Sequence, residues 1–153
     1  MGRDAGSTLH ATAFVIGEDG ILLRGPPGAG KSTLARELIA SATLAGRHAA
    51  LVCDDRVSLR AVHGRIVAEA VPAIAGLIEI RGTGIARVPF CESAVLRLVV
   101  DLVENPTRMP EQAALLTTIQ GVKLPRILVN GPLASGVVLW RLGLLDDQFV
   151  TVP

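Results

Sequence analysis

Short apolar runs, separated by turn-forming residues, extend through most of the chain. Residues 9–16 are rich in strand-forming side chains and predict a β-strand, an Asp-Gly turn within 18–20 reverses the chain, and residues 21–24 predict the returning strand. Apolar residues then recur on one helical face over 33–44, and Gly46 is a natural end for that helix. The pattern therefore predicts a hairpin followed by a helix.

After this helix the pattern is mainly that of strands. Residues 49–53 form a continuous apolar run, as expected of a buried parallel strand, and residues 63–65 fit the turn of a hairpin. The other expected elements are strands over 57–61, 66–70, 77–80, 94–102 and 127–129, a loop around 105–110, one or two helical turns over 111–118 and a short helix over 135–142. No repeat or linker divides the chain, so we expect one domain over residues 1–153.

The segment between the second predicted strand and the helix matches the phosphate-binding pattern G-x-x-x-x-G-K-[ST]. It consists of Gly25, Pro26, Pro27, Gly28, Ala29, Gly30, Lys31 and Ser32, followed by Thr33. Glycines let successive backbone N–H groups point at phosphate oxygens, and the helix adds the positive end of its dipole. We expect Lys31 along the outer phosphates of ATP and the Ser32 hydroxyl on Mg²⁺. The fold class this predicts is α/β, a P-loop (Walker A) nucleotide-binding domain with additional β-strands.

Two adjacent carboxylates, Asp54 and Asp55, directly follow the apolar run over 49–53. Walker B carboxylates occupy this position beside the metal and the γ-phosphate. Only one helix and one strand fit between Lys31 and Asp54, which favours a compact phosphotransferase over a large motor ATPase. The alternative is that Asp-Asp-Arg forms an ordinary turn.

Composition and charge narrow the possible functions. Half of the 153 residues are hydrophobic and 19% are charged, which argues against disorder. The mean hydropathy is +0.48, but no uncharged apolar run reaches the roughly 18 residues of a membrane span. The N-terminus shows no hydrophobic signal segment, so we expect a cytoplasmic protein without membrane contact. A net charge of +1 and 3% aromatic residues give no basis for nucleic-acid binding.

The remaining candidate residues carry weaker signals. Cys53 and Cys91 are too few and too far apart for a disulfide framework or a zinc cluster, and Cys53 is expected in the core. His10 lies on the first predicted strand, where a lone histidine is more often structural than functional.

Taken together, these segments resemble the catalytic domain of the bacterial HPr kinase/phosphorylase family. The resemblance is carried by Leu9-His10-Ala11-Thr12-Ala13, the glycine-rich loop, Val52-Cys53-Asp54-Asp55-Arg56-Val57 and Leu77-Ile78-Glu79-Ile80-Arg81-Gly82-Thr83-Gly84-Ile85. The last of these matches a signature of this family that P-loop proteins in general lack. The resemblance implies an HPr kinase/PEP carboxykinase-like fold, present here as the C-terminal catalytic domain in a short form without the family's N-terminal domain.

The resemblance also implies a function. The family uses ATP and Mg²⁺ to phosphorylate a serine of HPr, the small phosphocarrier of the phosphotransferase system, and many members also remove that phosphate with inorganic phosphate. The roles implied by position are phosphate binding for Lys31, Mg²⁺ binding for Ser32, Asp54 and Glu79, proton acceptance for Asp55 assisted by His10, and a catalytic arginine at Arg108. A homo-hexamer and a regulatory role in carbon or nitrogen metabolism are further implications.

The family's dephosphorylation loop carries a Gly-Arg-Asn element, whereas the corresponding residues 129–135 here read Val-Asn-Gly-Pro-Leu-Ala-Ser. An incoming phosphate needs extra cationic donors, so we expect kinase activity rather than phosphorylase activity. Two alternatives stay open. A small-molecule P-loop kinase would need an arginine-rich lid, and no such helical insertion is evident. A nucleotide-sensing module would not need the lysine, serine and carboxylates that this chain retains.

Overall fold

A mixed β-sheet forms the centre of the fold in the computed structural model, which describes residues 6–131 and 134–143. Its strands are β1 (Ser7–Leu9), β2 (Thr12–Ile16), β3 (Asp19–Arg24), β4 (Ala49–Cys53), β5 (Val57–Val62), β6 (Arg65–Glu69), β9 (Ser93–Leu102), β10 (Leu116–Ile119) and β11 (Val122–Val129). They follow the order β1-β5-β6-β9-β3-β2-β4, with β11 also pairing with β9, and β10 with β11. The fold is therefore mixed α/β.

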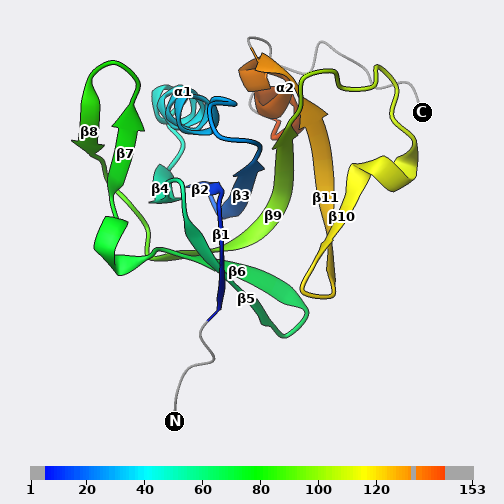
Figure 1. Cartoon of the computed structure of the whole chain (residues 1–153), viewed down its shortest axis with the longest axis horizontal. Helices are drawn as coiled ribbons and strands as arrows, with labels where there is room; N and C mark the ends of the chain where they lie inside the picture. Colours follow the sequence, from blue (N-terminus) through cyan, green and yellow to red (C-terminus); the bar gives the residue numbers. More distant parts are fainter. Residues whose placement is uncertain (1–5, 132–133, 144–153) are drawn as a thin grey trace.

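The long strand β9 joins the two parts of this sheet. Its first residues, 93–95, pair antiparallel with β6, whereas residues 96–101 pair in parallel with β3. On its other edge, residues 99–102 pair in parallel with β11. Figure 1 shows β9 curving from the β5–β6 hairpin up to the end of the sheet where the helices lie. The carboxyl ends of β3, β9 and β11 consequently meet at one edge.

Two helices and a small hairpin complete the described structure. Helix α1 spans Lys31–Leu44 and α2 spans Ala134–Arg141, with short 3₁₀ turns at Pro72–Ile74 and Gln112–Leu115. Strands β7 (Leu77–Ile80) and β8 (Gly84–Arg87) form a separate two-stranded sheet that projects beside α1 (Figure 1). No helix among the described residues is both long and apolar enough to cross a membrane.

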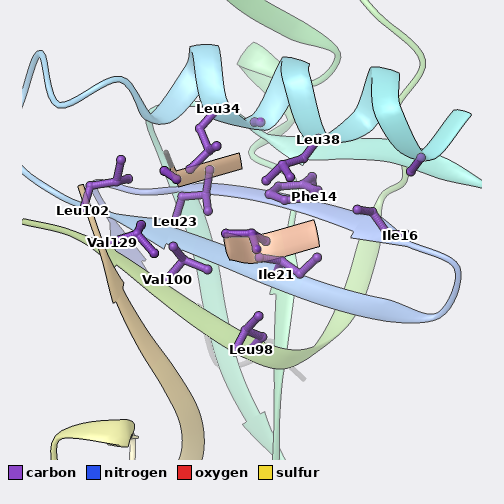
Figure 2. Close-up of a cluster of buried hydrophobic side chains, with 14 residues drawn as sticks. Phe14, Ile16, Ile21, Leu23, Leu34, Leu38, Leu98, Val100, Leu102 and Val129 are labelled. Atoms are coloured by element: carbon purple, nitrogen blue, oxygen red, sulfur yellow. The ribbon is translucent and has the colours of Figure 1, made fainter. Parts of the chain in front are cut away.

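Apolar alternation along the central strands builds two cores, one on each face of the sheet. In the first core, Leu34 and Leu38 of α1 pack toward Phe14 of β2 and Leu23 of β3 (Figure 2). Leu22, between Ile21 and Leu23, belongs instead to the second core, because successive strand residues point to opposite faces. Strand β2 is buried along its whole length, because the core beneath α1 covers one of its faces and the second core covers the other.

Most locally encoded elements appear where the sequence predicts them. Helix α1 and the strands β4, β7 and β9 begin and end within about two residues of their predicted bounds, as does α2. The β5–β6 hairpin turns at His63 and Gly64, both with positive φ, which matches the turn that right-twisted hairpins prefer. The predicted helical turns over 111–118 are a 3₁₀ turn followed by β10, and β11 is longer than the predicted 127–129.

Three sequence predictions about the strands are wrong. The strand predicted over 9–16 is two strands, β1 and β2, with a break at His10 and Ala11. The break occurs because β1 pairs with β5, whereas β2 pairs with β3. The first hairpin turns at Gly17 and Glu18, not at Asp19-Gly20, because Gly17 supplies the positive φ of +61°. Strand β4 forms its ladder with β2 in the antiparallel sense, and its parallel pairing is limited to an isolated bridge between Leu51 and Phe90. Its apolar run reflects burial alone, which does not determine strand direction.

Candidate functional site

The glycine-rich loop leaves the carboxyl end of β3 and returns into α1. Gly28 and Gly30 have φ of +81° and +95°, a left-handed backbone that favours glycine. The Lys31 ammonium lies along the inside of the loop, where Nζ donates to the carbonyl oxygens of Gly25 at 2.8 Å and Pro26 at 3.2 Å. The loop thus holds its one cation next to its own backbone.

The N-terminus of α1 is left open by the surrounding structure. Gly30 is its N-cap, no side chain that the structure describes caps it, and its first turn contains no acidic residue. The first N–H groups of a helix lack partners within the helix and carry a partial positive charge. Together with the lysine, this arrangement suits an anion such as a phosphate.

Asp54 lies behind the loop and is almost fully buried, at 6% exposure. Its Oδ1 accepts hydrogen bonds from the hydroxyls of Thr12 at 2.8 Å and Ser32 at 2.7 Å, and its Oδ2 accepts one from the backbone N–H of Glu79 at 3.2 Å. These three donors come from β2, α1 and β7. A single carboxylate therefore ties together the sheet, the glycine-rich loop and the projecting hairpin.

Asp55 has a different environment from its neighbour. Its side chain is 79% exposed, and its Oδ1 lies 3.8 Å from Nδ1 of His10, which is 83% exposed. That separation is within reach of an ion pair but too long for a direct hydrogen bond. The backbone N–H of Arg56 donates to the Asp54 carbonyl at 2.7 Å, and Asp55 between them has φ of +65°. This is the positive-φ form of a γ-turn, which is rare and strained.

A cavity of about 180 Å³ opens between the loop, α1 and the hairpin. It is lined by Thr12, Pro27, Gly28, Gly30, Lys31, Ser32, Thr33, Asp55, Glu79 and Arg81. Four further residues contact the lining residues without lining the cavity themselves. Lys31 bonds to Gly25 and Pro26, and Ser32 bonds to Asp54. Asp55 lies beside His10. Ala29 lies on the other side of the loop, in a groove of about 550 Å³ between the loop and the ends of β9 and β11.

Arg108 is not brought to this cavity. It is exposed in the segment between β9 and the 3₁₀ turn at Gln112–Leu115, and it lines neither the cavity nor the adjacent groove in the described structure. Of the loop over 129–135, Asn130 and Gly131 line the groove, whereas residues 132 and 133 are outside the described part of the chain.

The cavity wall also contains two residues that the sequence does not predict there, Thr12 and Arg81. Thr12 is a fully buried polar residue in an otherwise apolar strand, and that interruption of the pattern was the available signal. Arg81 belongs to the segment after Glu79 that carries the family resemblance, where the sequence gives it no role of its own. Its guanidinium approaches the glycine-rich loop, with Nη2 3.8 Å from where a Cβ on Gly28 would stand. No local pattern marks an arginine that reaches across to another segment.

The residues in this cavity fit Mg²⁺ in the manner usual for nucleotide sites. The described residues contain no cluster of three or more His, Cys, Asp and Glu side chains that could cage a metal alone. They do place the Ser32 hydroxyl against the Asp54 carboxylate, with Glu79 on the same wall. Mg²⁺ typically takes one or two carboxylates and completes its shell with water and substrate phosphates. The site offers two carboxylates, Asp54 and Glu79, together with the Ser32 hydroxyl, which matches this preference.

The cysteines lie apart from this chemistry. Both are free thiols, and Cys53 is fully buried in the second core, as its position in an apolar run predicted. Burial raises the pKa of the Cys53 thiol, only partly offset by the N–H of Val71, which donates to its sulfur at 3.4 Å. The raised pKa favours the neutral thiol, so Cys53 is a packing residue.

In this α/β fold, a lysine and an open helix N-terminus beside buried and exposed carboxylates could hold a phosphate, and comparison with known proteins identifies the family. The family described as HPr Serine kinase C-terminal domain matches residues 5–131. The chain belongs to this family, as its sequence predicts.

Individual relatives agree with the family match. An HPr kinase/phosphorylase of Burkholderia cenocepacia is 33% identical over 142 residues, covering 85% of this chain and 41% of the relative. One from Clostridium tetani is 36% identical over 81 residues, covering 53% of this chain and 25% of the relative. The chain thus spans less than half of the length of these relatives. The solved structure of the Hpr(Ser) kinase/phosphatase from Coxiella burnetii aligns with a TM-score of 0.72 and 29% identity, over 90% of this chain and 95% of that one.

Proposed function

We propose that this protein is an ATP- and Mg²⁺-dependent protein-serine kinase that phosphorylates an HPr-like phosphocarrier of the phosphotransferase system. One observation carries the proposal: a single cavity is lined by the loop lysine, the Ser32 hydroxyl, Asp55 and Glu79, with Asp54 bonded to its wall. Membership of the HPr serine kinase family supports the choice of an HPr-like protein as the substrate.

In the proposed reaction, residues Gly25 to Thr33 hold the phosphates through backbone N–H groups, and Lys31 exchanges its contacts with the loop carbonyls for phosphate oxygens. Ser32, Asp54 and Glu79 would hold Mg²⁺, which neutralises charge on the phosphates when bound. The acceptor serine oxygen forms a bond to the γ-phosphorus, the bond from that phosphorus to the ADP oxygen breaks, and the serine proton passes to Asp55. His10, 3.8 Å from Asp55, assists by accepting or stabilising that proton.

Exposure of the proposed proton acceptor favours a protein substrate over a metabolite. Small-molecule kinases enclose their acceptor to exclude water. Here Asp55 and His10 are 79% and 83% exposed at the mouth of the cavity. A serine on a protein surface can reach carboxylates placed in this way, and the partner protein then supplies the cover. The basic residues that follow Gly82 are available as part of a docking surface.

The proposal extends to direction, assembly and place of action. Forward transfer is favoured over phosphorolysis, because the segment over 129–131 brings no cation to the groove. By family resemblance we propose a homo-hexamer acting in the cytoplasm, with Arg108 entering the site only through assembly or loop movement, and a regulatory role in carbon or nitrogen metabolism.

The test is incubation of the protein with ³²P-labelled ATP, Mg²⁺ and either HPr or a panel of hydroxyl-bearing metabolites. Label on HPr at one serine, lost when that serine is replaced by alanine, is the expected result. Label on a metabolite alone would make the protein a small-molecule kinase. ATP binding by calorimetry without transfer to any acceptor would make it a nucleotide-sensing module.

A further inference from the structure

The two polar side chains buried in the core of the described structure are bonded to each other. These are Thr12, with no exposed surface, and Asp54. A buried hydroxyl needs hydrogen-bond partners, and Thr12 finds them in the acidic pair rather than in its own strand. Its hydroxyl donates to Asp54 Oδ1 at 2.8 Å and lies 3.5 Å from the backbone nitrogen of Asp55, whose N–H points at it.

The Thr12 hydroxyl therefore contacts both members of the acidic pair in different ways. A threonine hydroxyl has one proton to donate and lone pairs to accept with. Because the proton is used on the Asp54 carboxylate, the lone pairs are directed toward the Asp55 N–H. This orients the side chain of Asp54 and restrains the main chain from which the Asp55 side chain extends.

The backbone of Asp55 is strained, so a contact that restrains it affects where its side chain lies. Asp55 lies at the centre of a γ-turn with φ of +65°, a conformation that costs of order 1–3 kcal/mol and persists only where the surroundings hold it. Thr12 is the side chain that contacts the Asp55 amide from outside this turn. An Asp55 released into ordinary extended backbone would point its carboxylate in another direction, away from His10.

We infer that Thr12 is a positioning residue of the phosphotransfer site, holding the strained turn over 54–56 so that Asp54 faces Ser32 while Asp55 faces the acceptor. The inference rests on the proposed function for its kinetic consequence, but the restraint itself is a property of the metal-free protein. No pattern in the sequence gives Thr12 this role, since the hydroxyl is recognised only when β2 and the end of β4 are placed side by side.

The first experiment compares Thr12→Val, which keeps the shape and removes the hydroxyl, with Thr12→Ser, which restores it. Hydrogen exchange of the Asp55 and Arg56 amides is followed by NMR without Mg²⁺ or nucleotide. Thr12→Val is expected to speed the exchange of Asp55 by about tenfold, and Thr12→Ser to return it near the wild-type rate. Thr43→Val is the matched control, since it removes a hydroxyl bonded to the Ile39 carbonyl on α1. Unchanged Asp55 exchange in a folded Thr12→Val protein would overturn the inference.

The second experiment measures transfer to the carrier. Thr12→Val is expected to lower kcat by about 10–100-fold with little change in the KM for ATP, because misplacement of a reacting group acts on the transition state. Thr12→Ser is expected within about threefold of wild type. An equal kcat for Thr12→Val and wild type would also overturn the inference. If wild type transfers no phosphate, the proposed function fails, and amide exchange alone decides the role of Thr12.

If Thr12→Val does not fold, exchange of the Thr12 hydroxyl proton in the wild-type protein tests the same inference. The Thr12 hydroxyl proton is expected to exchange slowly enough to be seen by NMR, with a cross-peak to the Asp55 amide. Thr118, exposed on β10, provides the reference for a freely exchanging hydroxyl. Exchange of the Thr12 proton as fast as that of Thr118 would contradict the inference without any variant.

Discussion

Lys31 is the residue with the clearest expected effect on activity. Its ammonium is held inside the glycine-rich loop by the carbonyls of Gly25 and Pro26, beside the proposed phosphate position. Lys31→Ala is expected to lower phosphate transfer by about 10²–10³-fold, since a preorganised charge is lost where charge develops. Labelled-ATP assays on folded protein measure this. The control is Lys123→Ala, which removes the other lysine of the chain from an exposed position on β11. Near-normal turnover by Lys31→Ala would refute the assignment of the loop.

Glu79 is expected to act on Mg²⁺ through its carboxylate and on Asp54 through its backbone. The Glu79→Gln change keeps the N–H that donates to Asp54, so the fold is expected to stay intact. We expect the Mg²⁺ concentration for half-maximal activity to rise by about tenfold. A titration of activity against Mg²⁺ at saturating ATP measures the midpoint, with Glu111→Gln in an exposed loop as control. An unchanged midpoint would make Glu79 an ordinary residue of the hairpin.

The two thiols are expected to differ in reactivity. Burial raises the pKa of Cys53, so at a given pH fewer of these thiols are thiolates, and the sulfur is also shielded from solvent. Cys91 is only partly buried. Alkylation with iodoacetamide at about pH 8, read by mass spectrometry, should modify Cys91 first and Cys53 only when urea unfolds the protein. Equal rates in the native state would contradict the buried position of Cys53.

At the scale of elements, an ion-pair cluster joins the strand before the loop to β9 and β11. The Arg24 guanidinium forms two hydrogen bonds with Asp101, at 2.7 and 2.8 Å, and Arg126 reaches the same carboxylate at 3.3 Å. Arg24 also bonds Thr117 on β10, and Arg126 bonds the Ala114 carbonyl. The strand before the loop is thereby tied to β9, β10, β11 and the 3₁₀ turn at Gln112–Leu115. The Arg126 guanidinium is engaged by Asp101 and the Ala114 carbonyl, and Arg126 does not line the groove beside the glycine-rich loop.

Asp101→Asn is expected to destabilise the protein by about 1–3 kcal/mol, because two partly buried guanidiniums would lose their shared anion. Urea unfolding followed by circular dichroism measures the change as a lower midpoint at constant slope. Glu69→Gln is the comparison, since its cross-strand pair with Arg60 is more exposed and is expected to contribute below about 1 kcal/mol. A larger effect from Glu69→Gln would contradict this ranking of the two pairs.

Elements defined by neighbouring residues could be predicted, and those defined by distant partners could not. Helix α1 and the His63–Gly64 hairpin depend on periodicity and turn chemistry within a few residues. The break after β1, the direction of β4 and the β10 pairing depend on which distant strand lies alongside. In the site, the loop and the acidic pair form contiguous motifs, whereas Thr12 and Arg81 reach it only through folding.

At the scale of the whole molecule, forward and reverse transfer should differ. Phosphorolysis places a phosphate dianion beside a phosphoserine and two carboxylates, and like charges repel strongly away from bulk water. Asn130 and Gly131 bring amide groups but no charge to the groove. Serine-phosphorylated carrier with excess phosphate is therefore expected to release pyrophosphate at well below the forward rate. Release at a comparable rate would show that another cation, such as Arg108, enters the site.

The position of β9 also has a consequence for how the protein is made. Arg24 and Asp101 pair across 77 residues, so the strand that supports the loop is synthesised long after the loop itself. A nascent chain with all of residues 25–33 outside the ribosome still lacks its central strand, and long-range pairing of this kind forms late. At about 5–20 residues per second, the delay is several seconds. Nucleotide binding is thus expected only after translation passes residue 102, and premature termination before that point yields a motif without a site.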